Sequence, residues 1–493
     1  MESSPSALLK LLVPKTPFIL KTALWHTLYL SDTSSKWDLR TELTIKILRN
    51  MLGPDSPSSS ITKQQRLTTK DPGVKGKVWV SKVQFPADED GEGGLRDVLF
   101  NAIEAMKGDA SAAADYTKPP VLPLEAEWTG YRAGVPDNEP EPTNLSEKEK
   151  FEHLMKETTS KVTLLYLHGG AMYLLDPATY RPITSRLAKE SGGRVLSVRY
   201  RLSPQHPFPA ALLDALTAYL SLLYPPAGSP HAPVPADEIV FGGDSAGGTA
   251  CTALLQLLLH LRRSAPPGQA PKVRFHGHDV EVPLPAGLAL TSPWLDITRG
   301  LPSIEGLAHF DYLPPPSHTA GMRFPPCEAW PEKPPRAEIY CEGSALVHPL
   351  VSPLAARDWT DCPPLFISVG QEMLRDEDTV LAQRVARQGG VVVWREFEAM
   401  PHCFAMMLEA LPSAKIHCEE YGRFCKEAVE GKAESSGEIV AAKTMDKSEV
   451  DVKNLTELTD DKVDEYMQLA KERIIKRFVE RSGDPSAQAR PML

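Results

Sequence analysis

From residue 162 onward, short apolar runs alternate with segments of helical periodicity, and this alternation limits the fold more than any other feature of the chain. Runs that are apolar throughout are typical of strands buried on both faces. Such strands, separated by helices, predict the α/β class, with a mostly parallel central sheet flanked by helices. The expected strands are 162–167, 195–200, 239–242, 287–290, 365–369 and 391–397, and the expected helices are 180–190, 209–223, 246–263 and 377–388.

Other parts of the chain fall outside this alternation. Residues 1–160 read as helices with two strands, and they carry no chemistry that the sequence reveals. Residues 297–350 are rich in proline and interrupt the alternation, so we expect an excursion over the active-site face. The chain beyond residue 430 is charged and poor in aromatic residues, which favours disorder. We therefore expect an N-terminal region (1–160), an α/β domain (161–430) and a C-terminal tail (431–493) with one helix at 458–481 between disordered segments at 431–457 and 482–493.

Composition argues against two classes of protein. The chain has 493 residues with 64 acidic and 54 basic side chains, and its formal net charge is −10. Nucleic-acid binding relies on clustered Lys and Arg, so we expect no nucleic-acid partner. The 7 cysteines are scattered and form no Cys-x-x-Cys pair, which argues against a zinc ribbon or a disulfide scaffold. Free thiols are typical of a reducing compartment, so we expect an intracellular, cytoplasmic protein, with a single disulfide left open.

The N-terminal stretch 7–30 is apolar enough to be tested as a membrane segment. A spanning helix needs about 20 nearly uninterrupted apolar residues, and we expect neither such a helix nor a secretory signal. We expect a lid or core helix instead, and an amphipathic segment resting on a membrane surface stays open. The interrupting residues are Lys10, Pro14, Lys15, Pro17, Lys21 and His26.

A glycine-rich motif marks the strongest candidate for a catalytic residue. Residues 243–247 read Gly-Asp-Ser-Ala-Gly, directly after one expected strand and at the start of the expected helix 246–263. A strand, a sharp turn and a helix form the nucleophile elbow, which projects a serine hydroxyl above the sheet. We therefore predict that Ser245 is a nucleophile. The alternative is a glycine-rich turn whose serine only caps the helix.

A second motif, His-Gly-Gly-Ala at residues 168–171, directly follows the expected strand 162–167. Backbone N–H groups stabilise an oxyanion where the chain can approach without intervening side chains. Gly169 and Gly170 meet this need, and the N–H of Ala246 is expected as a third donor. His168 is predicted to brace the loop as a structural histidine, with a proton-carrying role as the alternative.

A serine nucleophile needs a base and an acid that orients the base, in the chain order Ser, acid, His. His402 follows the expected strand 391–397, and we predict it as the base. Glu372 lies nearest the end of the expected strand 365–369, and we predict it as the acid. Asp376, one helical turn later, is the alternative acid and is expected to cap or open the following helix.

These motifs, in this order, resemble the hormone-sensitive-lipase branch of the α/β-hydrolase superfamily over residues 160–428. The N-terminal third is similar to fungal members of this branch, including steryl-acetyl-hydrolase-like esterases. The resemblance also rests on Tyr200-Arg201-Leu202-Ser203-Pro204, Pro207-Phe208-Pro209-Ala210, Ser292-Pro293-Trp294-Leu295-Asp296, Glu372-x-Leu374-Arg375-Asp376 and Pro401-His402-x-Phe404.

The resemblance implies an α/β-hydrolase fold, a triad of Ser245, Glu372 and His402, and a helical cap. The cap would come from the N-terminal region, which suggests a covering role for residues 1–60 and 297–350. This sequence departs from the family pattern at two places. Most members have Asp where Glu372 stands, and many read His-Gly-Gly-Gly where this chain has Ala171.

We expect a serine carboxylic-ester hydrolase that acts on a small or medium hydrophobic ester such as an acetate. Its partner is a small-molecule ester, and no metal or organic cofactor is expected. An amidase or an acyltransferase could use the same triad, and a long-chain triglyceride lipase also stays open. A catalytically silent small-molecule receptor is the alternative from another class. The physiological ester and the oligomeric state are left open.

Overall fold

The computed structural model describes residues 13–482, apart from 55, 57, 89–90, 108–115, 320–321 and 333–334. The strands are β1 Val78–Phe85, β2 Leu124–Tyr131, β3 Thr163–Leu167, β4 Arg194–Val198, β5 Ile239–Asp244, β6 Lys272–Phe275, β7 His278–Glu281, β8 Gly287–Thr291, β9 Leu365–Gly370, β10 Val392–Phe397, β11 Ser436–Val440 and β12 Lys447–Glu449.

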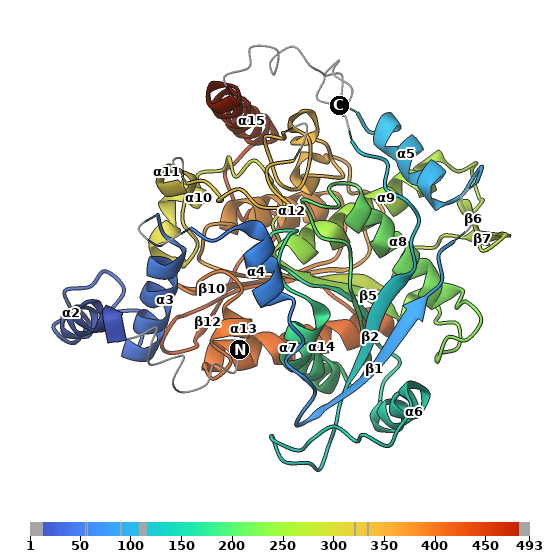
Figure 1. Ribbon diagram of the computed structural model, residues 1–493, viewed down its shortest axis with the longest axis horizontal. Helices are drawn as coiled ribbons and strands as arrows, with labels where there is room; N and C mark the ends of the chain where they lie inside the picture. The colour runs from blue at the N-terminus through green and yellow to red at the C-terminus, as the bar shows by residue number, and fades with distance from the viewer. Residues whose placement is uncertain are drawn as a thin grey trace.

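One main sheet contains all of these strands except the separate β6–β7 hairpin (Figure 1). Its strand order is β1-β2-β4-β3-β5-β8-β9-β10-β11-β12. Neighbours from β4 to β11 run parallel, whereas β1, β2 and β12 pair antiparallel. Every residue of β3, β5, β8, β9 and β10 is buried, as strands covered on both faces require. The predicted mostly parallel α/β sheet is therefore confirmed.

Helices cover both faces of this sheet (Figure 1). The helices are α2 Thr16–Thr27, α3 Leu39–Leu52, α4 Ile61–Thr68, α5 Leu95–Ala105, α6 Glu147–Glu157, α7 Pro177–Ser191, α8 Ala210–Leu223, α9 Ala246–Ser264, α10 Ser303–Gly306, α11 Pro316–Thr319, α12 Arg375–Arg387, α13 Phe404–Met407, α14 Pro412–Val429 and α15 Asp460–Ser482. Short 3₁₀ turns lie at Val13–Lys15, Ala236–Glu238, Ala308–Phe310, Gly343–Ala345 and Pro353–Ala355.

An apolar cluster packs against each face of the main sheet. One cluster joins α7 and α14 to the sheet and includes Tyr180, Leu187 and Tyr421. The larger cluster lies on the opposite face and joins α8, α9 and α12 to the sheet. All residues of α8 are buried, because α5 packs over it and its sequence is apolar around most of its circumference.

The prediction of disorder over residues 431–457 was wrong. β11 pairs parallel with β10, and β12 pairs antiparallel with β11, so this segment extends the main sheet. Its charges have partners across the sheet edge. Arg395 of β10 lies 3.2 Å from Glu438, and Lys447 lies 2.8 Å from Glu438. The predicted helix at 458–481 is confirmed as α15, and residues 483–493 of the predicted C-terminal disorder lie outside the described residues.

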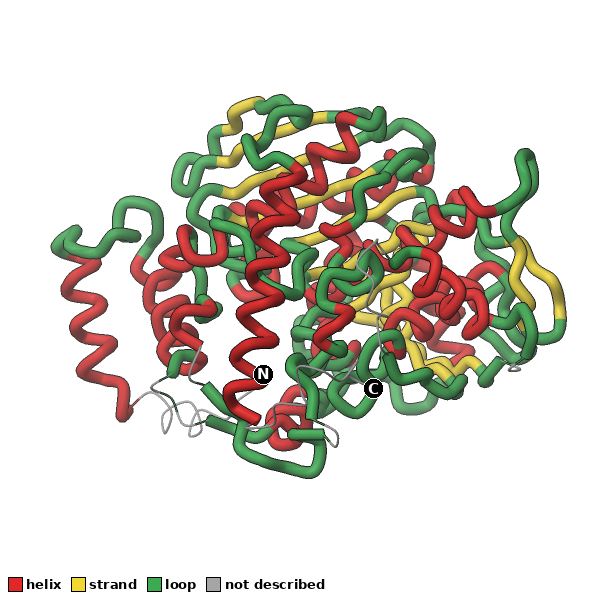
Figure 2. The backbone as a smooth tube through the Cα atoms, turned by 90° about the horizontal axis from the view of Figure 1, so that it is seen from above, coloured by secondary structure: helices red, strands yellow, loops and turns green. Residues whose placement is uncertain are grey.

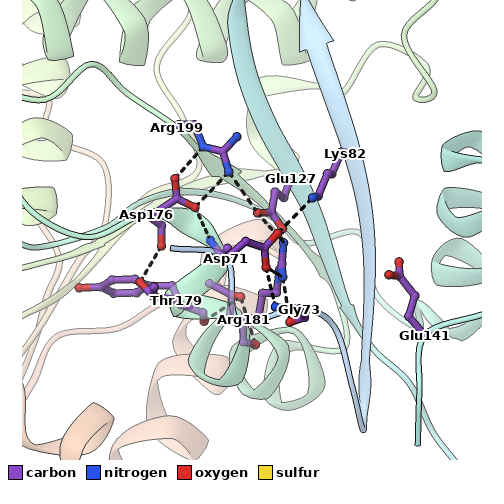
Figure 3. Close-up of polar contacts among 12 residues, drawn as sticks. Asp71, Gly73, Lys82, Glu127, Glu141, Asp176, Thr179, Arg181 and Arg199 are labelled. Atoms are coloured by element: carbon purple, nitrogen blue, oxygen red, sulfur yellow. Dashed lines mark hydrogen bonds and ion pairs between the residues drawn. The ribbon is translucent and has the colours of Figure 1, made fainter. Parts of the chain in front are cut away.

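A buried ionic network ties the N-terminal region to the α/β domain (Figure 3). Arg181 of α7 donates to Glu127 of β2 at 2.8 Å and to Asp71, before β1, at 2.6 Å. Arg199, just after β4, donates to Asp176 at 2.7 Å, and Asp176 caps the N-terminus of α7. The network therefore holds the start of α7, which follows the His-Gly-Gly-Ala loop, in a defined position.

The segment 297–350 forms an excursion between β8 and β9 that consists, where it is described, of short helices and turns. α3 packs against it, because Arg49 donates hydrogen bonds to the main-chain carbonyls of Ala308, His309 and Asp311. α2 lies beyond α3 at the edge of the molecule (Figures 1 and 2). Within the described residues, none of the helices is long and apolar enough to cross a membrane.

Candidate active site

Ser245 occupies a tight turn between β5 and α9. Its φ and ψ are 49° and −122°, a strained combination for a residue other than glycine. The chain packs so closely around this turn that position 247 must be glycine, because a Cβ there would lie 1.9 Å from the carbonyl oxygen of Leu167. Ser245 is partly exposed although its neighbours are buried. These features are those of a nucleophile elbow.

The structure brings Ser245, His402 and Glu372 together from the ends of three parallel strands. His402 follows β10, and its Nε2 lies 2.9 Å from Ser245 Oγ. Its Nδ1 lies 3.3 Å from Oε1 of Glu372, which follows β9. The other carboxylate oxygen of Glu372 accepts the N–H of Leu374 at 2.7 Å, so the loop itself orients this side chain.

Asp376, the alternative acid, serves another purpose. Its carboxylate accepts the N–H of Ser303 at 2.8 Å, and its own N–H donates to Ser303 Oγ at 3.1 Å. Asp376 lies in the first turn of α12, as expected, and its contacts there fix α10 on the excursion. The geometry therefore places Glu372, and not Asp376, next to the imidazole.

His402 is almost completely buried, and its surroundings favour the imidazolium form. Burial by itself lowers the pKa of His402, but the side chains of Cys403, Tyr312 and Glu372 raise it, and the pKa ends well above its ordinary value. Cys403 Sγ lies 3.5 Å from His402 Nε2, and burial raises the pKa of Cys403 to about 12, so this neighbour stays a thiol. Stabilising the imidazolium is what a base in a serine triad requires when it takes the serine proton.

The oxyanion loop differs from our expectation at Gly169. The N–H of Gly169 points to Oδ1 of Asp244 and to the hydroxyl of Tyr180, both at 3.1 Å, and so is not directed at a substrate. The reason for glycine here is space, because a Cβ would lie 2.3 Å from Asp244 Oδ2. Gly170 has φ 107°, a conformation that favours glycine, and its loop begins at the same edge of the sheet as Ser245, because β3 and β5 are parallel neighbours. The donor roles of Gly170 and Ala246 remain predictions.

His168 fits the structural role predicted for it. It is 2% exposed and stacks on Tyr200 with ring centroids 4.4 Å apart. Its Nδ1 lies 2.7 Å from the carbonyl oxygen of Gly169. Burial lowers the pKa of His168 to about 4, so it is neutral and braces the loop.

Two residues of the excursion reach the triad, and the sequence pointed to neither of them. The ring of Tyr312 has its centroid 6.3 Å from that of His402. The fully buried carboxyl of Asp311 lies against that of Glu372, and its Oδ2 accepts the N–H of Met373, the next residue, at 3.4 Å. No local pattern marks these residues, because their contacts depend on the path of a proline-rich loop.

All 7 cysteines are free thiols. Among the residues that the structure describes, no group of three or more His, Cys, Asp or Glu side chains could hold a metal ion.

Comparison with known proteins identifies the family. The family model described as alpha/beta hydrolase fold matches residues 164–406. An acetyl-hydrolase of Streptomyces hygroscopicus is 33% identical over 269 residues, which are 54% of this chain and 76% of that protein. An esterase of Acinetobacter venetianus is 27% identical over 275 residues, covering 55% of this chain and 77% of that protein.

A solved structure agrees in fold. The crystal structure of a hormone-sensitive lipase from a metagenome library superposes with a TM-score of 0.50 at 23% identity, covering 80% of this chain and 99% of that one. The fold, the elbow geometry and the match to the acetyl-hydrolase lead to one assignment: the chain belongs to the α/β-hydrolase fold family.

Proposed function

We propose that this protein hydrolyses carboxylic esters through an acyl-enzyme on Ser245. The observation that carries the proposal is the continuous chain of contacts from Ser245 Oγ to His402 Nε2, and from His402 Nδ1 to Glu372. The esterases and acetyl-hydrolase among its relatives support the same reaction class. A silent receptor would have no need to keep all three groups in contact.

In the first half of the reaction, His402 Nε2 takes the proton of Ser245 while Oγ attacks the ester carbonyl. The N–H groups of Gly170 and Ala246 hold the resulting oxyanion, and the N–H of Ala171 replaces Gly169 as the proposed third donor. His402 then returns its proton to the leaving alcohol. Glu372 keeps Nδ1 protonated and stabilises the imidazolium.

In the second half, water attacks the acyl-enzyme after His402 takes one of its protons. The tetrahedral intermediate collapses when His402 returns this proton to Ser245 Oγ, and the carboxylic acid leaves. The acyl group is proposed to be short or medium in length, with acetate as the first candidate. The name of the Streptomyces relative supports acetate, and Tyr312 beside His402 limits the space near the reacting carbon.

The test is hydrolysis of p-nitrophenyl esters from acetate to palmitate by the wild type and Ser245→Ala. We expect the substitution to lower kcat by a factor on the order of 10⁶, because members of a triad act as a unit. A fluorophosphonate should increase the mass of the wild type by one covalently bound phosphonyl group and leave the mass of Ser245→Ala unchanged. A variant whose activity stays within roughly tenfold of the wild type would contradict the role of Ser245.

Transfer to an acceptor other than water is tested in the same assay. An acceptor alcohol or amine is added during p-nitrophenyl acetate turnover, and the products are separated. Free acetate as the main product supports a hydrolase. Preferential formation of the acceptor's acetyl ester would instead make the protein an acyltransferase, and cleavage of an anilide at a comparable rate would make it an amidase.

A further inference from the structure

Helix α2 turns its apolar side chains outward. Leu20, Leu24 and Leu28 form one stripe at a spacing of four residues, and their exposed fractions are 64%, 56% and 56%. Thr22, on the opposite face, is only 6% exposed. A surface helix of a globular protein normally buries its apolar stripe and exposes its polar one. The turn after α2 extends the exposed surface with Tyr29 and Leu30.

Polar contacts on the inner face of α2 determine this orientation. His26 of α2 pairs with Glu42 of α3, whose side chain is completely buried. Glu42 also binds Lys46 and Ser31. Turning α2 over to bury its leucines would take His26 away from this buried carboxylate and leave it only Lys46 and Ser31, which is unfavourable. The outward stripe is therefore a consequence of how α2 is attached to α3.

The charged residues near the stripe are basic, which favours binding to an acidic surface. Residues 7–30 contain Lys10, Lys15 and Lys21 and no Asp or Glu, although the whole chain has a net charge of −10. Lys21 Nζ lies 4.7 Å from the ring centroid of Trp25, which is 44% exposed. Aromatic and basic residues beside exposed leucines are typical of helices that lie in the interface of a bilayer.

We propose that α2 and the turn after it, residues 16–30, dock on the surface of a bilayer that contains anionic phospholipid. The leucine stripe and Trp25 enter the headgroup boundary, and Lys21 faces the phosphates. Contacts connect this surface to the proposed active site: α2 is attached to α3, and Arg49 of α3 donates to the main chain next to Tyr312, which lies beside His402. Docking would present the site to esters dissolved in the bilayer.

The test is co-sedimentation with vesicles of phosphatidylcholine, with and without phosphatidylserine, using the full chain. We expect binding only to the phosphatidylserine vesicles, and weaker binding at high salt. The triple variant Leu20→Ser/Leu24→Ser/Leu28→Ser should bind at least roughly tenfold more weakly. The single control Leu469→Ser alters a leucine of similar exposure on α15, away from α2 (Figure 1), and should bind like the wild type.

Turnover of p-nitrophenyl acetate in solution is measured in parallel, and the triple variant should keep the wild-type rate. This keeps the test of docking separate from that of the esterase reaction. Failure of the wild type to bind phosphatidylserine vesicles, or equal binding by the triple variant, would overturn the proposal. So would a dimer at sedimentation equilibrium that the triple variant abolishes, since the stripe would then be covered by a second copy of the chain.

A separate observation concerns Asp311. Its Oδ1 accepts the N–H groups of Tyr312 and Leu313 at 2.7 and 3.1 Å. Its Oδ2 accepts the N–H of Met373 at 3.4 Å, which places the carboxyl beside that of Glu372. Both carboxyls are completely buried. Two buried carboxyls in contact cannot both be ionised without a large cost, so they share one proton. Arg49 does not neutralise the pair, because it donates to the main-chain carbonyl of Asp311.

We propose that Asp311 is a positioning residue: its protonated carboxyl donates a hydrogen bond to Glu372 and holds it in the orientation that His402 requires. Burial and the charge of Glu372 raise the pKa of Asp311 to about 7, which agrees with a proton on this group. The ionisable groups that act on the pair from the surrounding elements are His402, Tyr312, Arg49, Arg299, Glu377 and Asp378.

Two substitutions and a pH profile test this role. In Asp311→Asn the amide still donates to Glu372, so kcat on the pH plateau should stay within about threefold of the wild type. The asparagine cannot lose a proton, so the additional negative charge that ionisation of Asp311 would place near His402 as the pH rises can no longer form. The imidazolium of His402 is therefore less stable, and the acid limb of kcat/KM should move to lower pH.

Asp311→Leu removes the donor, and its plateau kcat should fall roughly tenfold with little change in KM. A purely structural aspartate would lower the stability of both variants without moving the acid limb. The same acid limb in the wild type and Asp311→Asn, or equal kcat for Asp311→Asn and Asp311→Leu, would overturn the proposal.

Discussion

The triad and the elements that lie over it are built in different ways. Ser245 directly follows β5, and Glu372 and His402 lie in the short loops after β9 and β10, so the register of these strands sets where the three residues start. The covering elements, α3 and residues 308–313, are not positioned by strands of the sheet. They are attached to each other and to the triad through single side chains, such as Arg49 and Asp311.

The two regions therefore contribute different properties to the enzyme. Groups fixed by a sheet keep catalytic distances within narrow limits, which favours the chemistry common to a family. Groups held by isolated side-chain contacts can change without disturbing the sheet, which favours variation in substrate and in location. We therefore expect substitutions in the sheet loops to affect kcat, and those in the covering elements to affect stability, KM or surface binding.

The largest effect is expected at the triad acid. Glu372→Gln keeps the size of the side chain but removes the charge that orients His402 and stabilises its imidazolium. kcat should fall by roughly 10³–10⁴. The matched control is Asp376→Asn, which alters a carboxylate four residues away in contact with Ser303 and should change kcat less than about threefold. An equal loss in both variants would mean that the loop, and not one carboxylate, supports the base.

The second effect is on folding. Arg181→Met removes the hydrogen-bonding partner of Glu127 and leaves this buried carboxylate only Arg199, 3.9 Å away, so the free energy of unfolding should fall by about 3–5 kcal/mol. Lys82→Met, which breaks the exposed pair with Asp71, should cost at most about 1 kcal/mol. Urea unfolding measures both. Since the network fixes the start of α7 and touches no reacting group, activity per folded molecule should be unchanged in each variant.

The residues that could be predicted from the sequence are those with a local signal. Ser245 is marked by a strand, a glycine-rich turn and a helix, and His402 and Glu372 by their places after strands. The role of Gly169 was not predictable, because the same glycine that could expose an N–H also makes room for Asp244. Asp311 and the strand β11 depend on partners distant in the chain, and the charge that suggested disorder at Glu438 is paired with Arg395.

A third, smaller effect tests the corrected role of Gly169. Gly169→Ala would place a methyl group against the buried carboxylate of Asp244, and overpacking of this kind costs about 1–3 kcal/mol of stability. Gly306→Ala is the control, because a Cβ there meets nothing within 4 Å. Its stability should stay within about 0.5 kcal/mol of the wild type. If Gly169→Ala kept full stability but lost kcat, glycine would be required here for the geometry of the reacting loop and not for the close contact with Asp244.

The smallest effect is expected where α3 meets the excursion. Arg49→Met keeps the aliphatic stem but removes the donors to Ala308, His309 and Asp311, so the loop that carries Tyr312 should loosen. We expect a loss of about 1–2 kcal/mol in unfolding free energy. KM for p-nitrophenyl acetate should rise a few-fold with kcat changed less than about twofold, because the sheet still holds the triad. Arg40→Met, on an exposed position of the same helix, is the control for lost charge. A fall in kcat without a change in KM would show that the covering elements set the triad geometry, and the division between sheet and cover would then fail.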